Sequence, residues 1–142
     1  MRVVLDTNIL ISALISPHGL PEAIYRAWRA ARFELVTSDF QLDEIRRASR
    51  YPKLRERLKP AQVGTMINSF RHQATVLEKL NLASGTADPD DAFLTAMALE
   101  AQADYLVTGD KRAGLLQLGH IERTRILTPA AFQAEVLDKN IS

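Results

Sequence analysis

Cysteine is absent from this chain of 142 residues, which excludes disulfide bonds and metal sites built on thiolates. Histidine is scarce, and His18, His72 and His120 show no spacing typical of metal ligands. A metal ion bound by this protein would therefore rest mainly on oxygen ligands, which suit Mg²⁺ or Mn²⁺.

Long apolar runs are also missing, so we expect no segment that spans a bilayer and no membrane partner. The sequence enters a strand-like run at once, with no signal peptide ahead of it, and this favours a cytoplasmic location. The length is close to the commonest size for one domain. Because we find no internal repeat and no linker, residues 1–142 are predicted to form a single domain.

A large charge of one sign is missing as well, since the net charge is only +1. The basic residues are nevertheless unevenly distributed, with seven of them and a single acid between positions 46 and 59. We take Arg46, Arg50 and Lys53 as candidates for contacts with phosphate groups. The alternative is that this segment is simply the solvated face of a helix.

Short β-branched runs alternate with longer amphipathic or apolar segments along the whole chain. Strands are predicted at 3–5, 33–37, 75–77, 105–108 and 125–127. Helices are predicted at 8–16, 19–31, 39–50, 60–73, 90–103, 110–118 and 129–137, with a short helical piece between Pro52 and Pro60 and a loop at 81–89. This alternation is typical of a parallel sheet that is covered by helices on both faces.

Four acidic residues lie where such a sheet would gather carboxylates. Asp6 and Asp110 follow predicted strands. Asp91 lies at the start of the predicted helix at 90–103, which is apolar nearly all round, and Glu44 lies within the predicted helix at 39–50. Open parallel sheets bind ligands at the carboxyl ends of their strands. Carboxylates that are held close together repel one another, so the group makes most sense around a divalent cation. The pattern therefore indicates metal-dependent hydrolysis.

Each acid alone also has a plain structural interpretation. Asp6, Asp90 and Asp110 all occupy positions where an aspartate caps a helix. Glu44 could be an ordinary helical glutamate that pairs with Arg47. The choice of Asp91 over its neighbour Asp90 stays open, and the functional hypothesis depends on the joint order of the acids along the chain.

That joint order resembles the PIN-domain nucleases over roughly residues 1 to 130. The matching segments are Val3–Asn8, Ser38–Glu44, Asp88–Leu94 and Tyr105–Lys111. A further segment, Tyr51–Leu58, is similar to bacterial PIN proteins that act as toxins of toxin–antitoxin pairs.

The resemblance implies a three-layer α/β/α sandwich with a central, mostly parallel, Rossmann-like sheet, and Mg²⁺- or Mn²⁺-dependent cleavage of RNA. The implied catalytic residues are Asp6, Glu44, Asp91 and Asp110. Of these, the three aspartates would bind the metal, as one ion or two, with Asn8 and Thr108 as polar supports. The implied partners are RNA, a cognate antitoxin protein and a second copy of the chain in a homodimer.

Two other functions would fit parts of the sequence. Phosphotransfer through Asp6 as a nucleophile would resemble the haloacid dehalogenases, but that pattern requires a second aspartate where this chain has Asn8. The other alternative is an RNA-binding or protein-interaction module that keeps the fold without catalysis. Such a module would be expected to have lost its acids, and here all four are present.

Overall fold

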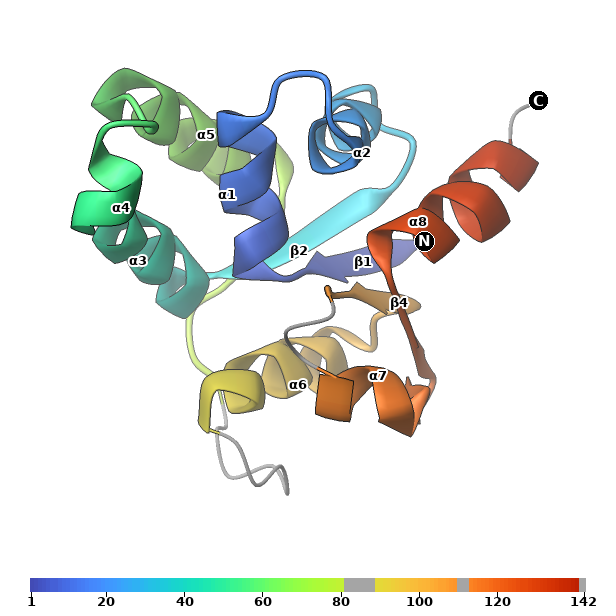
Figure 1. Ribbon diagram of the computed structural model, residues 1–142. Coiled ribbons are helices and arrows are strands. Elements are labelled where there is room, and N and C mark those ends of the chain that lie inside the picture. Colours follow the sequence, from blue (N-terminus) through green and yellow to red (C-terminus); the bar gives the residue numbers. More distant parts are fainter. Residues whose placement is uncertain (81–88, 110–112, 141–142) are drawn as a thin grey trace.

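A six-stranded sheet forms the centre of the protein, as shown by a computed structural model that describes residues 1–80, 89–109 and 113–140 (Figure 1). The strands are β1 (Arg2–Leu5), β2 (Glu34–Ser38), β3 (Thr75–Leu77), β4 (Tyr105–Val107), β5 (His120–Ile121) and β6 (Thr124–Leu127). Their order is β3-β2-β1-β4-β6-β5. All neighbouring strands are parallel except β5, which pairs with β6 in an antiparallel hairpin.

Helices cover both faces of this sheet. They are α1 (Thr7–Ile15), α2 (Leu20–Arg29), α3 (Asp39–Ala48), α4 (Pro52–Arg55), α5 (Pro60–Gln73), α6 (Pro89–Ala101), α7 (Ala113–Leu118) and α8 (Pro129–Phe132). The last helix continues as the π-helical η2 (Gln133–Leu137) and the 3₁₀-helical η3 (Asp138–Asn140). In Figure 1, α1, α2 and α5 lie on one side of the sheet, and α6 and α7 lie on the other. The predicted three-layer α/β/α sandwich is confirmed.

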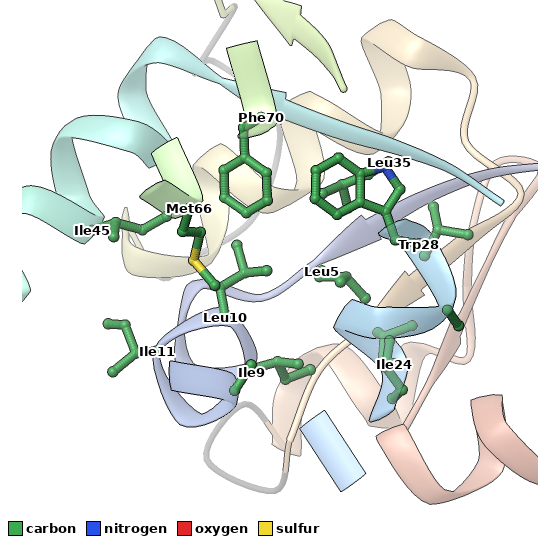
Figure 2. Close-up of a cluster of buried hydrophobic side chains, with 14 of the residues drawn as sticks. Leu5, Ile9, Leu10, Ile11, Ile24, Trp28, Leu35, Ile45, Met66 and Phe70 are labelled. Carbon is green, nitrogen blue, oxygen red and sulfur yellow. The ribbon is translucent and has the colours of Figure 1, made fainter. Parts of the chain in front are cut away.

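The alternating faces of the strands build two hydrophobic cores. Along β1, Val3 and Leu5 point into the core under α1, α2 and α5, whereas Val4 points into the core under α6. Because both faces are buried, the strand is continuously apolar, as parallel strands generally are. In the larger core, Trp28 of α2 and Phe70 of α5 pack with ring centroids 5.1 Å apart (Figure 2).

The smaller core depends on α6, which was expected to be buried because it is apolar nearly all round. Its side chains Phe93, Leu94 and Met97 are almost fully buried. None of the helices in the described part of the chain is long and apolar enough to cross a membrane.

The connections define one special position in the sheet. From β1 the chain moves outward to β2 and β3, and then returns to place β4 on the other side of β1. The direction of winding therefore reverses between β1 and β4. In open α/β sheets, ligands bind at the carboxyl ends of the strands at such a switch point.

Candidate active site

Asp6 lies at the switch point, directly after β1, and only 1% of its surface is exposed. Its backbone N–H donates to the carbonyl of Val107, at the end of β4, over 2.9 Å. Its side chain also caps α1, since Oδ1 accepts from the backbone N–H of Asn8 at 3.1 Å. The capping interpretation of this residue is thus correct, and it does not exclude a second role.

Thr108 holds the other oxygen of the same carboxylate. It follows β4, is fully buried, and its hydroxyl donates to Asp6 Oδ2 over 2.7 Å. Its backbone N–H donates to Leu127, the last residue of β6, so its position is fixed by the sheet. Asn8 is exposed and supports Asp6 through its backbone. The structure therefore brings together three of the residues that the sequence singled out.

Gln41 connects α3 to the same end of β1, and sequence reasoning missed it. Its side chain is fully buried, and its amide donates to the carbonyl of Leu5 at 2.8 Å and to the hydroxyl of Thr7 at 3.3 Å. Its amide oxygen accepts from the hydroxyl of Thr37 at 2.6 Å. These bonds fix the first turn of α3 against the residues on either side of Asp6. The available signal was a glutamine three residues after the capping Ser38, on the apolar side of the helix.

Glu44 lies one turn beyond Gln41 on α3 and is half-buried. Residues three apart on a helix lie on the same side, so Glu44 shares the side of α3 from which Gln41 reaches Leu5 and Thr7, one turn further along. Within the described part of the chain Glu44 has no hydrogen bond or ion pair, and the pairing with Arg47 does not form. Its carboxylate is therefore not committed to a structural contact there.

Asp90 and Asp91 lie in the first turn of α6, and their side chains fall outside the described part of the structure. The start of α6 is placed by Phe93, whose ring lies 5.1 Å from that of Phe40 in the first turn of α3. Asp110 lies outside the described residues, as do residues 81–88 of the predicted loop at 81–89, whose last residue, Pro89, begins α6. Among the described residues, no three acidic or histidine side chains form a group that could hold a metal ion.

The chemistry of the donors at the switch point nevertheless suits a hard cation. Asp6 presents a buried carboxylate whose Oδ1 and Oδ2 are held in fixed directions by the bonds from Asn8 and Thr108. The described polar side chains that are buried here, Asp6, Thr7, Gln41 and Thr108, offer oxygen or amide groups, and oxygen is the ligand atom that Mg²⁺ and Mn²⁺ prefer. The carboxylate of Asp6 fits such an ion, and the convergence of Asp91 and Asp110 on it stays a prediction.

The three basic residues lie in and after α3 and in α4. Arg46 is in the last turn of α3 and is paired with Asp43 at 2.9 Å, whereas Arg50 lies two residues beyond the end of that helix at Ala48. Lys53 lies on the short helix α4 and is exposed. All three are at the surface, as contacts with phosphates require.

The three-layer α/β/α fold places this protein among the Rossmann-like α/β proteins, which bind ligands at the carboxyl ends of their strands, where Asp6 is buried. Within that class, the PIN domain family matches residues 2–112, and the chain belongs to this family. It is also similar to an uncharacterized protein of Methanocaldococcus jannaschii, with 31% identity over 112 residues, which are 78% of this chain and 72% of that protein. PIN domains are generally nucleases that use divalent metal ions.

Proposed function

We propose that this protein is an Mg²⁺- or Mn²⁺-dependent endoribonuclease, with its active site at the carboxyl ends of β1 and β4. The observation that carries the proposal is the carboxylate of Asp6, which is buried at the switch point and held by Thr108 and Asn8. Burying a carboxylate is costly, and an uncharged cap would serve the helix as well. Its retention at a ligand-binding edge favours a chemical role.

In this proposal the residues of the chain have distinct tasks. Asp6, Asp91 and Asp110 would hold the divalent ion, which when bound supplies charge for the scissile phosphate and lowers the pKa of a coordinated water. Thr108 fixes the orientation of the Asp6 carboxylate through their 2.7 Å hydrogen bond. Gln41 fixes α3 against Leu5 and Thr7.

Glu44 is the residue that we assign to the attacking water. It has no hydrogen bond or ion pair in the described structure, and it is partly open to solvent. A glutamate in this state can accept a hydrogen bond from water or add a further oxygen to the ion. Arg46, Arg50 and Lys53 would bind flanking phosphates, and such contacts position the strand without reading its sequence.

The biological setting that we propose is the toxin of a toxin–antitoxin pair. The support is the similarity of residues 51–58 to bacterial PIN toxins. A cognate antitoxin, a homodimer and a cytoplasmic location all stay predictions. A neighbouring gene for a small antitoxin-like protein would support this setting.

A cleavage assay tests the enzymatic part of the proposal. Purified protein is incubated with single-stranded RNA and with DNA of the same sequence, each with Mg²⁺, with Mn²⁺ and with EDTA. We expect internal cleavage of RNA that requires either metal. Binding of RNA without cleavage under any of these conditions would instead identify a binding module on the same fold. If the protein binds neither RNA nor DNA, the proposal is contradicted altogether.

A further inference from the structure

Away from the candidate active site, a pocket with a volume of about 370 Å³ lies between α3, α4 and α5. Three arginines line its walls: Arg46, Arg50 and Arg55. Its floor is apolar, because Val63 and Ile67 of α5 are buried beneath it. Ligand pockets in proteins generally have volumes of about 300 to 1,000 Å³, so this one has room for more than a single small ion.

The pocket is positively charged. Arg46 is the only one of its three arginines with an ion pair among the described residues, to Asp43 at 2.9 Å. Arg50 and Arg55 are exposed and have no carboxylate within salt-bridge distance in the described part of the chain. Guanidinium groups are suited to phosphate because they form a planar fork of donors.

Gly64 lies beside open space in the pocket. It lies within α5 and lines the pocket, and a Cβ built on it would meet no atom within 4 Å. Glycine within a helix is less favourable than alanine, and no close contact with a neighbour requires it here. The space above Gly64 is therefore available to a ligand.

The pocket is separate from the acidic site, although α3 contributes to both. Residues two apart on a helix point about 200° apart, so Arg46 points away from Glu44. The contacts agree with this: Phe40, on the side of Glu44, packs against Phe93 of α6, whereas Arg46 and Arg50 line a pocket with α5. A ligand in the pocket would thus lie across α3 from the acids.

We propose that this pocket binds one nucleotide, with its phosphate on the arginines and its base or ribose over Val63 and Ile67. The nucleotide belongs either to an RNA strand, which would extend the contacts of the proposed nuclease, or to a free mononucleotide. If the nucleotide belongs to an RNA strand, the inference rests on the proposed function. Binding of a free mononucleotide does not depend on that function.

The direct test is binding of adenosine 5′-monophosphate, with adenosine and inorganic phosphate as the comparison probes. Changes in amide chemical shifts would be followed in the full-length protein. We expect the nucleotide to bind more tightly than either probe and to shift residues 60–67 and 46–55. An absence of saturable binding at millimolar nucleotide, or shifts confined to other residues, would overturn the proposal.

Two pairs of variants locate the site. Gly64→Leu fills the pocket, whereas Gly64→Ala adds one methyl group in open space and is expected to raise stability slightly. Leucine is expected to weaken nucleotide binding by about tenfold or more, and alanine by much less. The double variant Arg50→Gln, Arg55→Gln should also lose binding, whereas Arg57→Gln, an exposed arginine that does not line the pocket, should not. Equal affinity in all four variants would refute the assignment.

The Gly64→Leu variant also separates the two sources of the nucleotide. If RNA occupies the pocket, this variant should raise KM for RNA cleavage and leave kcat unchanged. If a free nucleotide occupies it, cleavage is unaffected while the nucleotide still fails to bind. Asp6→Asn should keep nucleotide binding in either case, so a failure of the proposed nuclease activity would not be mistaken for a failure of the pocket.

Discussion

The Asp6 side chain can cap a helix and contribute to a functional site at the same time. From the sequence alone these two roles were alternatives. One oxygen caps α1 and the other accepts the hydroxyl of Thr108 from a strand that is distant in sequence. The cap was predictable, because an aspartate between a strand and a helix is the expected N-cap. The bond to Thr108 could only be expected through the family resemblance, since it joins residues 102 positions apart.

Replacing Thr108 tests whether the orientation of Asp6 matters for function. Thr108→Val removes the hydroxyl donor, and we expect cleavage to slow while the chain stays folded; a hydrogen bond to a charged group contributes about 1.5–3 kcal/mol. Thr108→Ser keeps the donor and should keep most of the activity. Cleavage and thermal stability would be measured together.

Thr124 supplies the matched control for this experiment. It is equally buried, and its hydroxyl donates over 2.7 Å to the carbonyl of Ala103 near the start of β4, away from Asp6. Thr124→Val should therefore lower stability without slowing cleavage. If the two valine variants lose cleavage to the same extent, the hydroxyl of Thr108 has no special role.

Gln41 also supports the candidate site without being part of it, so its replacement should slow cleavage indirectly. Gln41→Leu leaves the carbonyl of Leu5 and the hydroxyl of Thr37 without their partner. We expect a loss of about 1–3 kcal/mol of stability, together with slower cleavage. Gln62→Leu, at an exposed helical position, should change stability by no more than about 0.5 kcal/mol. Denaturant unfolding of both variants checks this, and a neutral Gln41→Leu would contradict the role assigned to Gln41.

At the scale of helices and strands, the hydrophobic patterns predicted most elements. The helix from Pro60 to Gln73 was predicted at its exact limits, because proline is favoured in the first turn and the apolar spacing is clear. The apolar helix after Pro89 was predicted from a composition that only burial explains. Local patterns of this kind depend on short stretches of sequence, and they therefore transfer directly to structure.

Two of the departures from prediction have identifiable reasons. The second helix was predicted to reach Ala31 but ends at Arg29. The reason is that Ala31 adopts a left-handed conformation with φ of 62°, which an alanine in the sequence does not predict. Strand β5 was not predicted, since it has only two residues and its turn places Glu122 at φ of 51° without a glycine. Conformations that tertiary contacts impose on ordinary residues leave no local signal.

Asp104 joins elements at the edge of the sheet opposite the candidate site. Its carboxylate accepts from the backbone N–H of Arg2 at 2.8 Å and from the guanidinium of Arg123 at 2.7 Å. The bond from Arg2, reinforced by Arg123, lowers the pKa of Asp104 below its ordinary value of 3.8. Because the folded-state pKa is depressed, this group adds stability above pH 4 that is lost as the pH falls through the folded value.

We therefore expect Asp104→Asn to be less stable than the wild type at pH 7. The difference should shrink as the pH falls below about 4, where the wild-type carboxyl group becomes protonated. Urea unfolding at pH 7 and at pH 3 measures it. A difference that is the same at both pH values would show that the charge of Asp104 contributes nothing.

For the whole molecule, the candidate site was predictable only in part. The sheet order brings Asp6 and Thr108 together and places the starts of α3 and α6 side by side, as the sequence suggested. The position of Gln41 was not predicted, because a buried glutamine with three partners depends on packing between β1, β2 and α3. The convergence of Asp91 and Asp110 on Asp6 stays a prediction.

Metal binding should appear in the stability of the folded protein. An ion that binds only the folded state stabilises it by about 2.7 kcal/mol at one hundred times its dissociation constant. We expect excess Mn²⁺ to raise the melting temperature, and Asp91→Asn to raise it in EDTA by relieving repulsion among carboxylates. Thermal scans of both proteins, with EDTA and with Mn²⁺, test this. A wild type that does not respond to the ion, with an apo variant that is less stable, would show that these acids only cap helices.

The most direct test of the nuclease site is single-turnover RNA cleavage by Asp6→Asn, compared with Asp104→Asn at the opposite edge of the sheet. Both variants replace a hydrogen-bonded carboxylate by an amide, and only the first lies at the switch point. If Asp6 holds the ion that stabilises the reacting phosphate, its variant should cleave slower by on the order of a hundredfold or more. The Asp104 variant should cleave at the wild-type rate under conditions in which both are folded. Wild-type cleavage by Asp6→Asn would contradict the assignment of this edge as the active site.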